Sequence, residues 1–394
     1  MSQGPLSRVF IKVAMKRLSA VEADRGVSNQ HEYNGTVALR EMFGEADRAE
    51  IPTKFLWIGD SDETLSEDGF LTWYDARRAH PTRSEYRLYF RSTSVSDRAA
   101  PNDTLFIAMR PDGSAMVVVT PAGSTRQSQL IWLFGLPDQP DFAFAVADQG
   151  NRSAGYVEDL ILETLGIERD ETEPDAIEAL IAQFKGIFPT TRVLSALARQ
   201  SAGVLSAVDD PDGALIAWMK QEERLFRALE KHVVKERLAT GFAEDVDGFL
   251  SYSLSVQNRR KSRAGFALGN HVEVILKANN VDFVREATTE KRNGPDFLFP
   301  SESAYHNAGF QAVGLRMLAV KTTCRDRWRQ VMAEADRINP KHLLTLEPSI
   351  TTTQTTEMQK AGVQLVLPEA MLPTFTQAQQ SWVVTFRQFI NLVR

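Results

Sequence analysis

The sequence predicts two domains, a mostly β domain followed by an α/β domain in which helices flank a central mixed sheet. The chain has 394 residues, more than the roughly 250–300 that one hydrophobic core usually organises. Short apolar segments separated by turn residues fill the first 150 residues, whereas helical and strand patterns alternate from residue 264 onward. We therefore expect one domain at residues 1–165, an acidic linker at 166–189 and a second domain at 190–394.

The first domain is expected to contain short strands, each a run of apolar or β-branched residues bounded by turn residues. These are Val9–Ala14, Phe55–Ile58, Tyr86–Phe90, Leu105–Met109, Ala115–Val119, Leu130–Leu133 and Phe142–Val146. The spacing of apolar residues then becomes that of helices. The predicted helices are Val157–Leu165, Ala176–Phe184, Thr191–Arg199, Leu215–Arg237 and Val246–Leu254.

The second domain alternates helices with strands from residue 264 onward, which is typical of a layered α/β structure with a buried sheet. Helices are predicted at Gly265–Asn279, at Arg325–Ile338, just before Ala361 and at the end of the chain. Strands are predicted at Phe297–Phe299, Leu315–Lys321, His342–Leu346 and Val363–Leu367.

The composition excludes several classes of protein. With 43% apolar and 24% charged residues, the chain is not collagen-like, coiled-coil or mostly disordered. The single cysteine, Cys324, excludes an internal disulfide framework and a Cys-rich zinc site, which suits a reducing cytoplasm. No run approaches ~18 consecutive apolar residues. We therefore expect a cytoplasmic protein with no membrane segment.

The net charge of −6, taken alone, argues against a nucleic-acid partner, because proteins that bind polyanions usually carry a basic excess. However, residues 158–178 carry nine acids against Arg169, a local charge of −8. Residues 259–341 carry 15 basic and 9 acidic residues, a local charge of +6. This distribution indicates polyanion-binding modules joined by an acidic connector, although any one such run is more often a solvated face.

A carboxylate and an ammonium group adjoin apolar strands of the second domain in a pattern that suits phosphodiester hydrolysis. Asp296 opens the strand Phe297–Phe299, and Lys321 ends the next strand 25 residues later. If the strands are neighbours, Asp296 would hold a Mg²⁺ ion and Lys321 would position or polarise the attacking water. A Pro-Asp pair followed by a lysine is a weak signal on its own, because both residue types are common.

The segment that follows Lys321 strengthens this interpretation. In the predicted helix Arg325–Ile338 apolar residues form one buried stripe, and Glu334 lies on another face, from which it would return to the metal as a second carboxylate. Arg325-Asp326-Arg327 form a donor, acceptor and donor triplet suited to the edges of guanine and cytosine. The alternative for this triplet alone is a solvated, salt-bridged first turn.

Five longer runs make the pattern specific. They are Asn258-Arg259-Arg260-Lys261-Ser262-Arg263-Ala264-Gly265, Pro295-Asp296-Phe297-Leu298-Phe299-Pro300, Ala304-Tyr305-His306, Leu315-Arg316-Met317-Leu318-Ala319-Val320-Lys321-Thr322-Thr323-Cys324 and Asp326-Arg327-Trp328-Arg329-Gln330. In these runs the sequence closely resembles the EcoRII type II restriction endonucleases. The first domain resembles the same family more weakly, through Lys16-Arg17-Leu18-Ser19-Ala20 and Thr82-Arg83-Ser84-Glu85.

The resemblance implies a restriction-endonuclease-like fold for the second domain. For the first domain it implies an effector-DNA-binding pseudobarrel related to the B-three domains of plant transcription factors. Family members cleave sites built from CC and GG half-sites. In that scheme the family's site residues match catalytic Asp296, Lys321 and Glu334, the Mg²⁺ ligands Asp296 and Glu334, an important tyrosine at Tyr305, and CC:GG readers at Arg325, Asp326 and Arg327.

One departure from the family concerns the helix that opens the catalytic core. Members read Arg-Ala-Gly-x-Ser-Leu-Glu there, whereas here Leu268 is followed by Gly269, and the nearest carboxylate is Glu273. Either the additional metal contact is dispensable, or Glu273 supplies it, or activity is reduced. Trp218 would suit stacking on an extruded base, but a tryptophan in an amphipathic helix is more often part of the core.

Contacts to DNA are expected in both domains. Phosphate contacts, which position the duplex without reading its sequence, are assigned to Lys12, Lys16, Arg259, Arg260, Lys261 and Arg263. The effector site is assigned to Arg17, Arg83, Glu85, Arg87 and Arg91. Two of these, Arg87 and Arg91, alternate with Leu88 and Phe90 along a strand, so they would lie on a common exposed face. The alternative is an ordinary solvated β face.

The sequence therefore predicts a Mg²⁺-dependent type II site-specific deoxyribonuclease. It would act on double-stranded DNA as a homodimer, because a palindromic site has two-fold symmetry and each active site cuts one strand. The runner-up is a two-module, sequence-specific DNA-binding protein that does not cut, which Gly269 makes plausible. A third candidate is a nuclease of the same fold that acts on another nucleic acid, such as branched DNA. The Arg325-Asp326-Arg327 triplet argues against it, because structure-selective enzymes have less use for a base reader.

Overall fold

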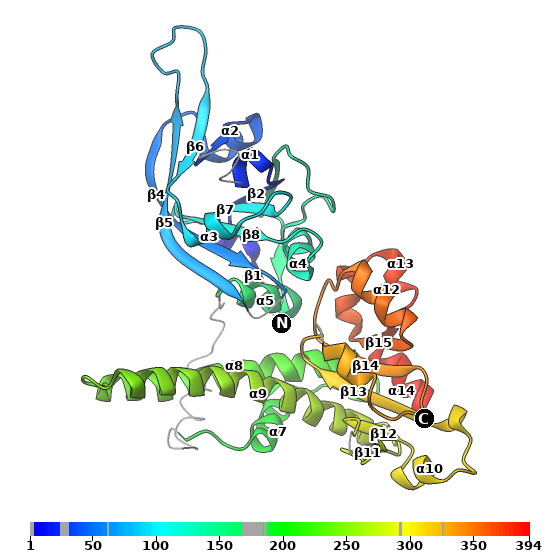
Figure 1. Cartoon of the computed structure of the whole chain (residues 1–394). Coiled ribbons are helices and arrows are strands. Elements are labelled where there is room, and N and C mark those ends of the chain that lie inside the picture. The colour runs from blue at the N-terminus through cyan, green and yellow to red at the C-terminus, as the bar shows by residue number, and fades with distance from the viewer. Residues whose placement is uncertain are drawn as a thin grey trace. The chain divides into compact units, whose positions relative to one another are not determined.

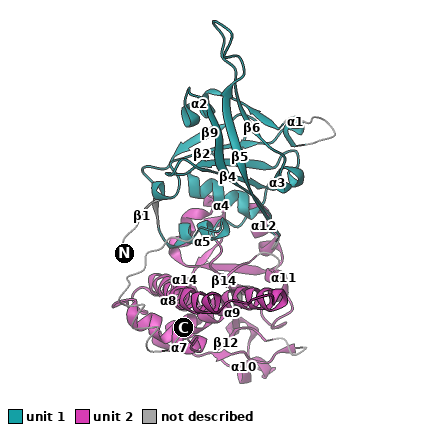
Figure 2. Cartoon of the chain, turned by 90° about the vertical axis from the view of Figure 1, so that its left-hand side faces the viewer, with its two compact units in different colours: residues 1–168, 348–351 teal, residues 169–347, 352–394 magenta. Residues whose placement is uncertain are grey.

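The structure is a computed structural model of the chain, and it describes residues 4–23, 31–60, 63–167, 184, 187–290, 294–324 and 327–394. The chain divides into two compact units (Figure 2). Unit 1 comprises residues 1–168 and 348–351, and unit 2 comprises residues 169–347 and 352–394. Residues 348–351 therefore group with the first unit, although the sequence places them in the second domain.

Unit 1 is built on an eight-stranded mixed sheet, with the order β3-β6-β5-β4-β8-β7-β2-β9 (Figure 1). Neighbours are antiparallel except β4 and β8, which are parallel. The strands are β2 Lys12–Arg17, β3 Glu32–Asn34, β4 Arg48–Ile58, β5 Thr64–Asp75, β6 Tyr86–Phe90, β7 Thr104–Met109, β8 Ala115–Thr120 and β9 Ala145–Asp148. A separate pair joins β1 Gly4–Pro5 to β10 Ser153–Ala154.

The sheet of unit 1 is curled, because strands from opposite ends of its order share one hydrophobic core. Tyr33 of β3 packs edge-on against Phe144, directly before β9, with 6.3 Å between the ring centroids. A second core covers the other face, where strand residues pack against two helices, α4 Thr125–Phe134 and α5 Tyr156–Thr164. The shorter helices are η1 Leu6–Arg8, α1 Ala20–Ala23, α2 Val37–Phe43 and α3 Ser94–Arg98.

The prediction of a strand at Leu130–Leu133 was wrong, because these residues lie in α4. Ser124 begins the helix by accepting a hydrogen bond from the N–H of Gln127 at 3.1 Å, a standard N-cap contact. A run of four apolar residues fits a buried helix as well as a strand, and only the cap distinguishes the two here. The structure also adds β5, which the sequence did not predict because polar residues and a glycine dominate its first half.

Unit 2 contains a six-stranded mixed sheet whose strands are neighbours in chain order. The first three strands are antiparallel, and those from β13 to β16 are parallel. Every residue of β12 and β14 is buried, as expected for strands covered on both faces. The strands are β11 Val284–Arg285, β12 Phe297–Phe299, β13 Arg316–Lys321, β14 Lys341–Thr345, β15 Val363–Leu367 and β16 Val384–Thr385.

Two long helices of unit 2, α8 Pro211–Thr240 and α9 Val246–Ala278, run side by side (Figure 1). Helix α9 joins into one element the two helices predicted at 246–254 and 265–279. The others are α7 Thr191–Ser201, α10 Glu302–His306, η3 Ala312–Gly314, α11 Trp328–Val331, α12 Thr352–Lys360, η5 Glu369–Thr374, α13 Gln377–Gln380 and α14 Phe386–Val393. In the described ranges no helix is long and apolar enough to cross a membrane. Apart from Phe184, the helix predicted at 176–184 lies outside them.

The helix predicted at Arg325–Ile338 was also wrong in its length, because α11 ends at Val331. The backbone of Ala335 adopts a positive φ of 48°, which a right-handed helix does not allow. The side chain of Lys341 donates instead to the carbonyl oxygens of Glu334 and Ala335. These tertiary contacts replace the helical hydrogen bonds that the apolar periodicity predicted.

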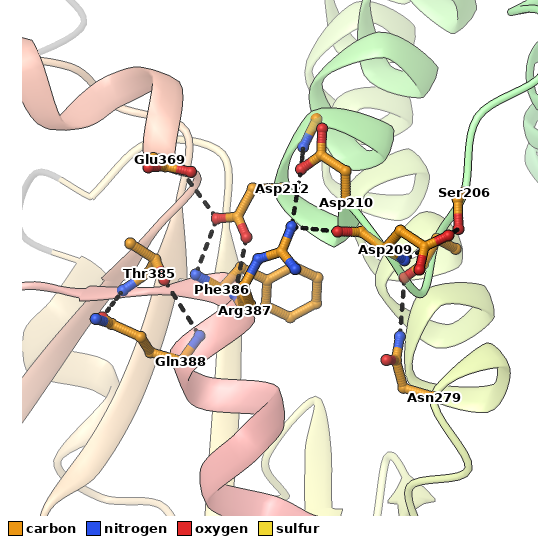
Figure 3. A network of polar contacts seen from close by, with 12 residues as sticks. Ser206, Asp209, Asp210, Asp212, Asn279, Glu369, Thr385, Phe386, Arg387 and Gln388 are labelled. Atoms are coloured by element: carbon orange, nitrogen blue, oxygen red, sulfur yellow. Dashed lines mark hydrogen bonds and ion pairs between the residues drawn. The ribbon is translucent and has the colours of Figure 1, made fainter.

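A buried carboxylate ties the start of α8 to the end of the chain. Asp212 accepts hydrogen bonds from the backbone N–H groups of Glu369, Phe386 and Arg387, at distances between 2.9 and 3.1 Å (Figure 3). Only 2% of Asp212 is exposed. Because unpaired buried N–H groups are unfavourable, these contacts anchor η5 and α14 to α8.

We therefore predict that Asp212→Ala lowers the free energy of unfolding of unit 2 by about 3 kcal/mol, because one buried and two partly buried N–H groups lose their acceptor. Urea unfolding followed by circular dichroism would measure the change. Asp282→Ala, which removes an exposed carboxylate, is the matched control. A loss no larger than that of the control would contradict the role assigned to Asp212.

Candidate active site

The register between β12 and β13 brings Asp296 and Lys321 together. Phe297 lies opposite Leu318 in this antiparallel pair, so Asp296, directly before Phe297, reaches the end of β13. Its Oδ2 accepts hydrogen bonds from the N–H of Val320 at 2.7 Å and from Nζ of Lys321 at 3.0 Å. The Asp296 side chain is 38% exposed, so the pair is open to solvent and to a substrate.

Glu334 joins this pair from the turn after α11 rather than from a helix face. Burial raises the pKa of Glu334 to about 7. The positive charges of Lys321 and Lys341 act to lower this pKa, and the negative charge of Asp296 acts to raise it. The charges of Lys321 and Asp296 thus both act on the Glu334 carboxylate. Among the described residues none hydrogen-bonds to its buried Oε2 atom.

Asp296 and Glu334 fit a Mg²⁺ ion. Mg²⁺ prefers oxygen ligands and is usually bound by one or two carboxylates, with water and substrate phosphate oxygens completing the set. The unpaired, buried Oε2 of Glu334 would gain a partner from a cation. In the part of the chain that the structure describes, no three His, Cys, Asp or Glu side chains cluster as a metal site. Carboxylate oxygens are the type of ligand that suits Mg²⁺.

The part of the chain that carries these residues is similar to known proteins. Residues 226–390 match the family described as EcoRII C terminal. A stretch of 182 residues, 46% of the chain, is 42% identical to the type II restriction enzyme EcoRII of Escherichia coli. The match spans 45% of the length of that relative.

Two solved structures are similar at lower identity. One is metal-depleted Ecl18kI in complex with uncleaved, modified DNA, with 20% identity and a TM-score of 0.45 over 57% of this chain and 84% of that one. The other is the restriction endonuclease PspGI with substrate DNA, with 15% identity and a TM-score of 0.43 over 52% of this chain and 92% of that one.

Tyr305, which lies in the stretch that matches the EcoRII C-terminal family, does not present its hydroxyl to the carboxylates of the site. The hydroxyl donates to Glu290, with oxygen distances of 2.8 and 2.6 Å, and the residue is 1% exposed. Burial, assisted by this hydrogen bond, raises the pKa of Tyr305 to about 12. At neutral pH the phenol therefore keeps its proton, and its contacts are those of a residue that holds structure.

Glu273 is committed to cations of the protein. Its carboxylate contacts Arg285 at 2.6 Å, Lys277 at 2.6 Å and Arg192 at 3.8 Å. Although burial acts in the opposite direction, hydrogen bonds from Lys277 and Arg285 hold the pKa of Glu273 below its usual value. A Cβ at Gly269 would lie 2.8 Å from Nη2 of Arg285, so the glycine makes room for the guanidinium.

The residues of unit 2 that were predicted to contact DNA differ in their surroundings. Arg325, Asp326 and the Lys261 side chain lie outside the described residues, whereas Arg327 is exposed. Arg260 pairs with Glu230 and Arg259 lies over Phe188. Arg263 is 6% exposed and contacts Glu222 and Glu223, so its guanidinium serves the packing of α8 against α9 and is not open to a phosphate. Trp218 is buried beside His271, in the core.

In unit 1 the predicted effector residues lie on and around β6. Glu85 contacts Arg77 and Arg87, and Arg87 also contacts Glu32 at 3.3 Å. Arg83 is exposed in the 76–85 connection, which projects from the sheet (Figure 1), and Arg91 is exposed after β6. Arg17 lies over the Phe142 ring. Lys12 is bound to the carbonyl of Glu41, and Lys16 is 7% exposed and paired with Glu22 at 2.6 Å, so Lys16 is not open to a phosphate.

Sequence reasoning missed two charged residues beside the site, Lys341 and Glu290. Both are bonded to the backbone of the turn that carries Glu334. A lysine directly before the predicted strand His342–Leu346 is a usable signal for Lys341. No local pattern indicates Glu290, because its partners lie 15 and 46 residues away.

The raised pKa of Glu334 predicts how the affinity for a divalent cation depends on pH. Below pH 7 the protonated form of Glu334 prevails and cannot bind a cation as a carboxylate. With a pKa near 7, about one tenth of the groups are ionised at pH 6 and about nine tenths at pH 8, so affinity should rise roughly tenfold. Calorimetric titration with Mn²⁺ would measure it. Equal affinities at both pH values, or the same rise in Glu334→Gln, would contradict this assignment.

Proposed function

We propose that the protein is a Mg²⁺-dependent type II site-specific deoxyribonuclease that hydrolyses phosphodiester bonds of double-stranded DNA. The convergence of Asp296, Lys321 and Glu334 within an EcoRII C-terminal domain carries this proposal. In it Asp296 and Glu334 hold Mg²⁺, which neutralises charge on the scissile phosphate when bound. Lys321, fixed against Asp296, holds and polarises the water that attacks phosphorus in line with the leaving oxygen.

The target proposed is a palindromic site with CC and GG half-sites, read by Arg325, Asp326 and Arg327, in which Arg pairs with guanine and Asp with cytosine. Two copies of the chain would act together, because each active site cuts one strand and a two-fold site suits a two-fold protein. Unit 1 would bind effector DNA as a pseudobarrel related to plant B-three domains. Its curled sheet and the exposed Arg83 and Arg91 support this part of the proposal.

Plasmid digestion tests the catalytic assignment. With Mg²⁺ the protein should cut plasmids that contain CC…GG sites, whereas Asp296→Ala and Lys321→Ala should each lower the rate by at least about 10³-fold, since each removes a group needed in the transition state. DNA binding should persist in both variants. Asp282→Ala, the exposed control, should cut normally.

Intact plasmids over a wide range of such sites would contradict the proposal. Binding without nicking, unaffected by Mg²⁺, would instead favour the non-cleaving DNA-binding protein. The ion pairs of Glu273 support this alternative, because they leave only Asp296 and Glu334 as the proposed carboxylate ligands of the cation.

The effector role proposed for unit 1 predicts a dependence on the number of sites. Plasmids with several CC…GG copies should be cut at least several-fold faster per site than plasmids with one copy, because a second copy on the same molecule has a high effective concentration. Arg83→Ala should reduce this difference without changing the slower rate. Rates that do not depend on copy number would argue against an effector role.

A further inference from the structure

The turn that carries Glu334 contains a residue in a left-handed conformation. Ala335 has a φ of 48°, a left-handed conformation that costs a non-glycine residue about 1–2 kcal/mol. Helix α11 ends at Val331 and β14 starts at Lys341, so the turn belongs to neither element. Its geometry therefore depends on contacts with side chains from outside the turn.

Three consecutive backbone N–H groups of this turn donate to three side chains of one neighbouring segment. The N–H of Ala335 donates to Oγ1 of Thr289 at 3.3 Å, and that of Asp336 to Oε2 of Glu290 at 3.2 Å. The N–H of Arg337 donates to the hydroxyl of Tyr305 at 3.4 Å. These side chains lie between β11 and the end of α10, so the segment next to β12 determines the path of the turn.

On its other side the turn is held by the ammonium group of Lys341. Nζ of Lys341 donates to the carbonyl oxygens of Glu334 and Ala335, the second at 2.8 Å. Lys341 is 7% exposed. The backbone from the Glu334 carbonyl to the Arg337 N–H is therefore bonded to side chains, which limits the positions that the Glu334 carboxylate adopts.

Glu290 is the centre of these contacts. It accepts from the Asp336 N–H and, through both oxygens, from the Tyr305 hydroxyl. Although burial acts in the opposite direction, these hydrogen bonds hold the pKa of Glu290 below its usual value, so that it stays ionised and keeps accepting. Arg337 adds a further tie, because its guanidinium donates to the carbonyl oxygens of Tyr305, Asn307 and Phe310.

We infer that Glu290 is a positioning residue for the divalent-cation site, which fixes Glu334 through the 335–337 backbone and the Tyr305 hydroxyl. This inference rests on the proposed function, since it takes Glu334 as a cation ligand. Glu290 itself touches neither the cation nor the substrate. It acts by keeping the Glu334 carboxylate in one place beside Asp296.

The test compares four variants of the full chain. Glu290→Ala removes both acceptors, Glu290→Gln keeps one acceptor oxygen, and Tyr305→Phe removes only the hydroxyl. Glu302→Ala, which removes a half-exposed carboxylate from α10, is the matched control. Calorimetric titration with Mn²⁺ gives cation affinity, plasmid cleavage against Mg²⁺ concentration gives the half-saturating concentration, and thermal unfolding reports folding.

Glu290→Ala should weaken Mn²⁺ binding and raise the half-saturating Mg²⁺ concentration by at least about tenfold, a typical cost of losing a residue that orients a metal ligand. The cleavage rate at saturating Mg²⁺ should stay within about threefold, because the reacting groups are unchanged. Glu290→Gln and Tyr305→Phe should lie between this variant and the control.

Two results would overturn the inference. Lower thermal stability with unchanged Mn²⁺ affinity in Glu290→Ala and Tyr305→Phe would give Glu290 a merely structural role. A lost rate at saturating Mg²⁺ with unchanged Mn²⁺ affinity would make it part of the chemistry. If the unmodified protein bound Mn²⁺ but cut no DNA, the proposed function would fail, and the Mn²⁺ comparison would still decide the role of Glu290.

Discussion

The antiparallel pairing of β12 with β13 is the constraint on which the site depends. It places Phe297 opposite Leu318, and with them Asp296 beside Val320 and Lys321. Because the residues of β12 are buried on both faces, a shift of one residue would turn every side chain to the wrong face. The packing of the apolar core thus fixes the position of a polar, half-exposed group. Strand β13 is also where the sheet changes from antiparallel to parallel.

The two carboxylates of the site are held in opposite ways. Asp296 is partly exposed and already bonded to Lys321 and a backbone N–H. Glu334 is mostly buried on an irregular turn, where burial raises its pKa. An unpaired buried carboxylate oxygen is unfavourable, and perturbed groups of this kind concentrate at functional sites. The contacts from Glu290 and Lys341 keep this carboxylate from moving to solvent, where its free energy would be lower.

The sequence was informative where apolar patterns and local spacing decide the structure. The bounds of β12 and β15 were predicted correctly, because each is a short apolar run bounded by turn residues. Of the apolar stripe predicted at Trp328, Val331, Met332, Ala335 and Ile338, four residues are buried, whereas Met332 is 36% exposed. The helix predicted through it was too long, because side chains distant in sequence bind the backbone from Ala335 onward.

The candidate site divides in the same way. Asp296 and Lys321 follow from strand order, so their spacing was enough to predict that they meet. Glu273 and Arg263 form ion pairs with residues of other elements, which their local sequence did not indicate. Glu290 was missed for a similar reason, since it bonds to a tyrosine and a backbone amide from distant parts of the chain. Tertiary packing decides which basic side chain pairs with which carboxylate, and no local sequence pattern indicates it.

The most direct test of this account is a crystal structure of the protein soaked with Mn²⁺, with the ion located by its anomalous scattering. The account predicts a peak about 2.2 Å from a carboxylate oxygen of Asp296 and from Oε2 of Glu334, the distance expected for an oxygen-bound divalent ion of this size, with Glu273 still paired to Arg285. A peak bound by Glu273 instead of Glu334, or no peak beside Asp296, would contradict it.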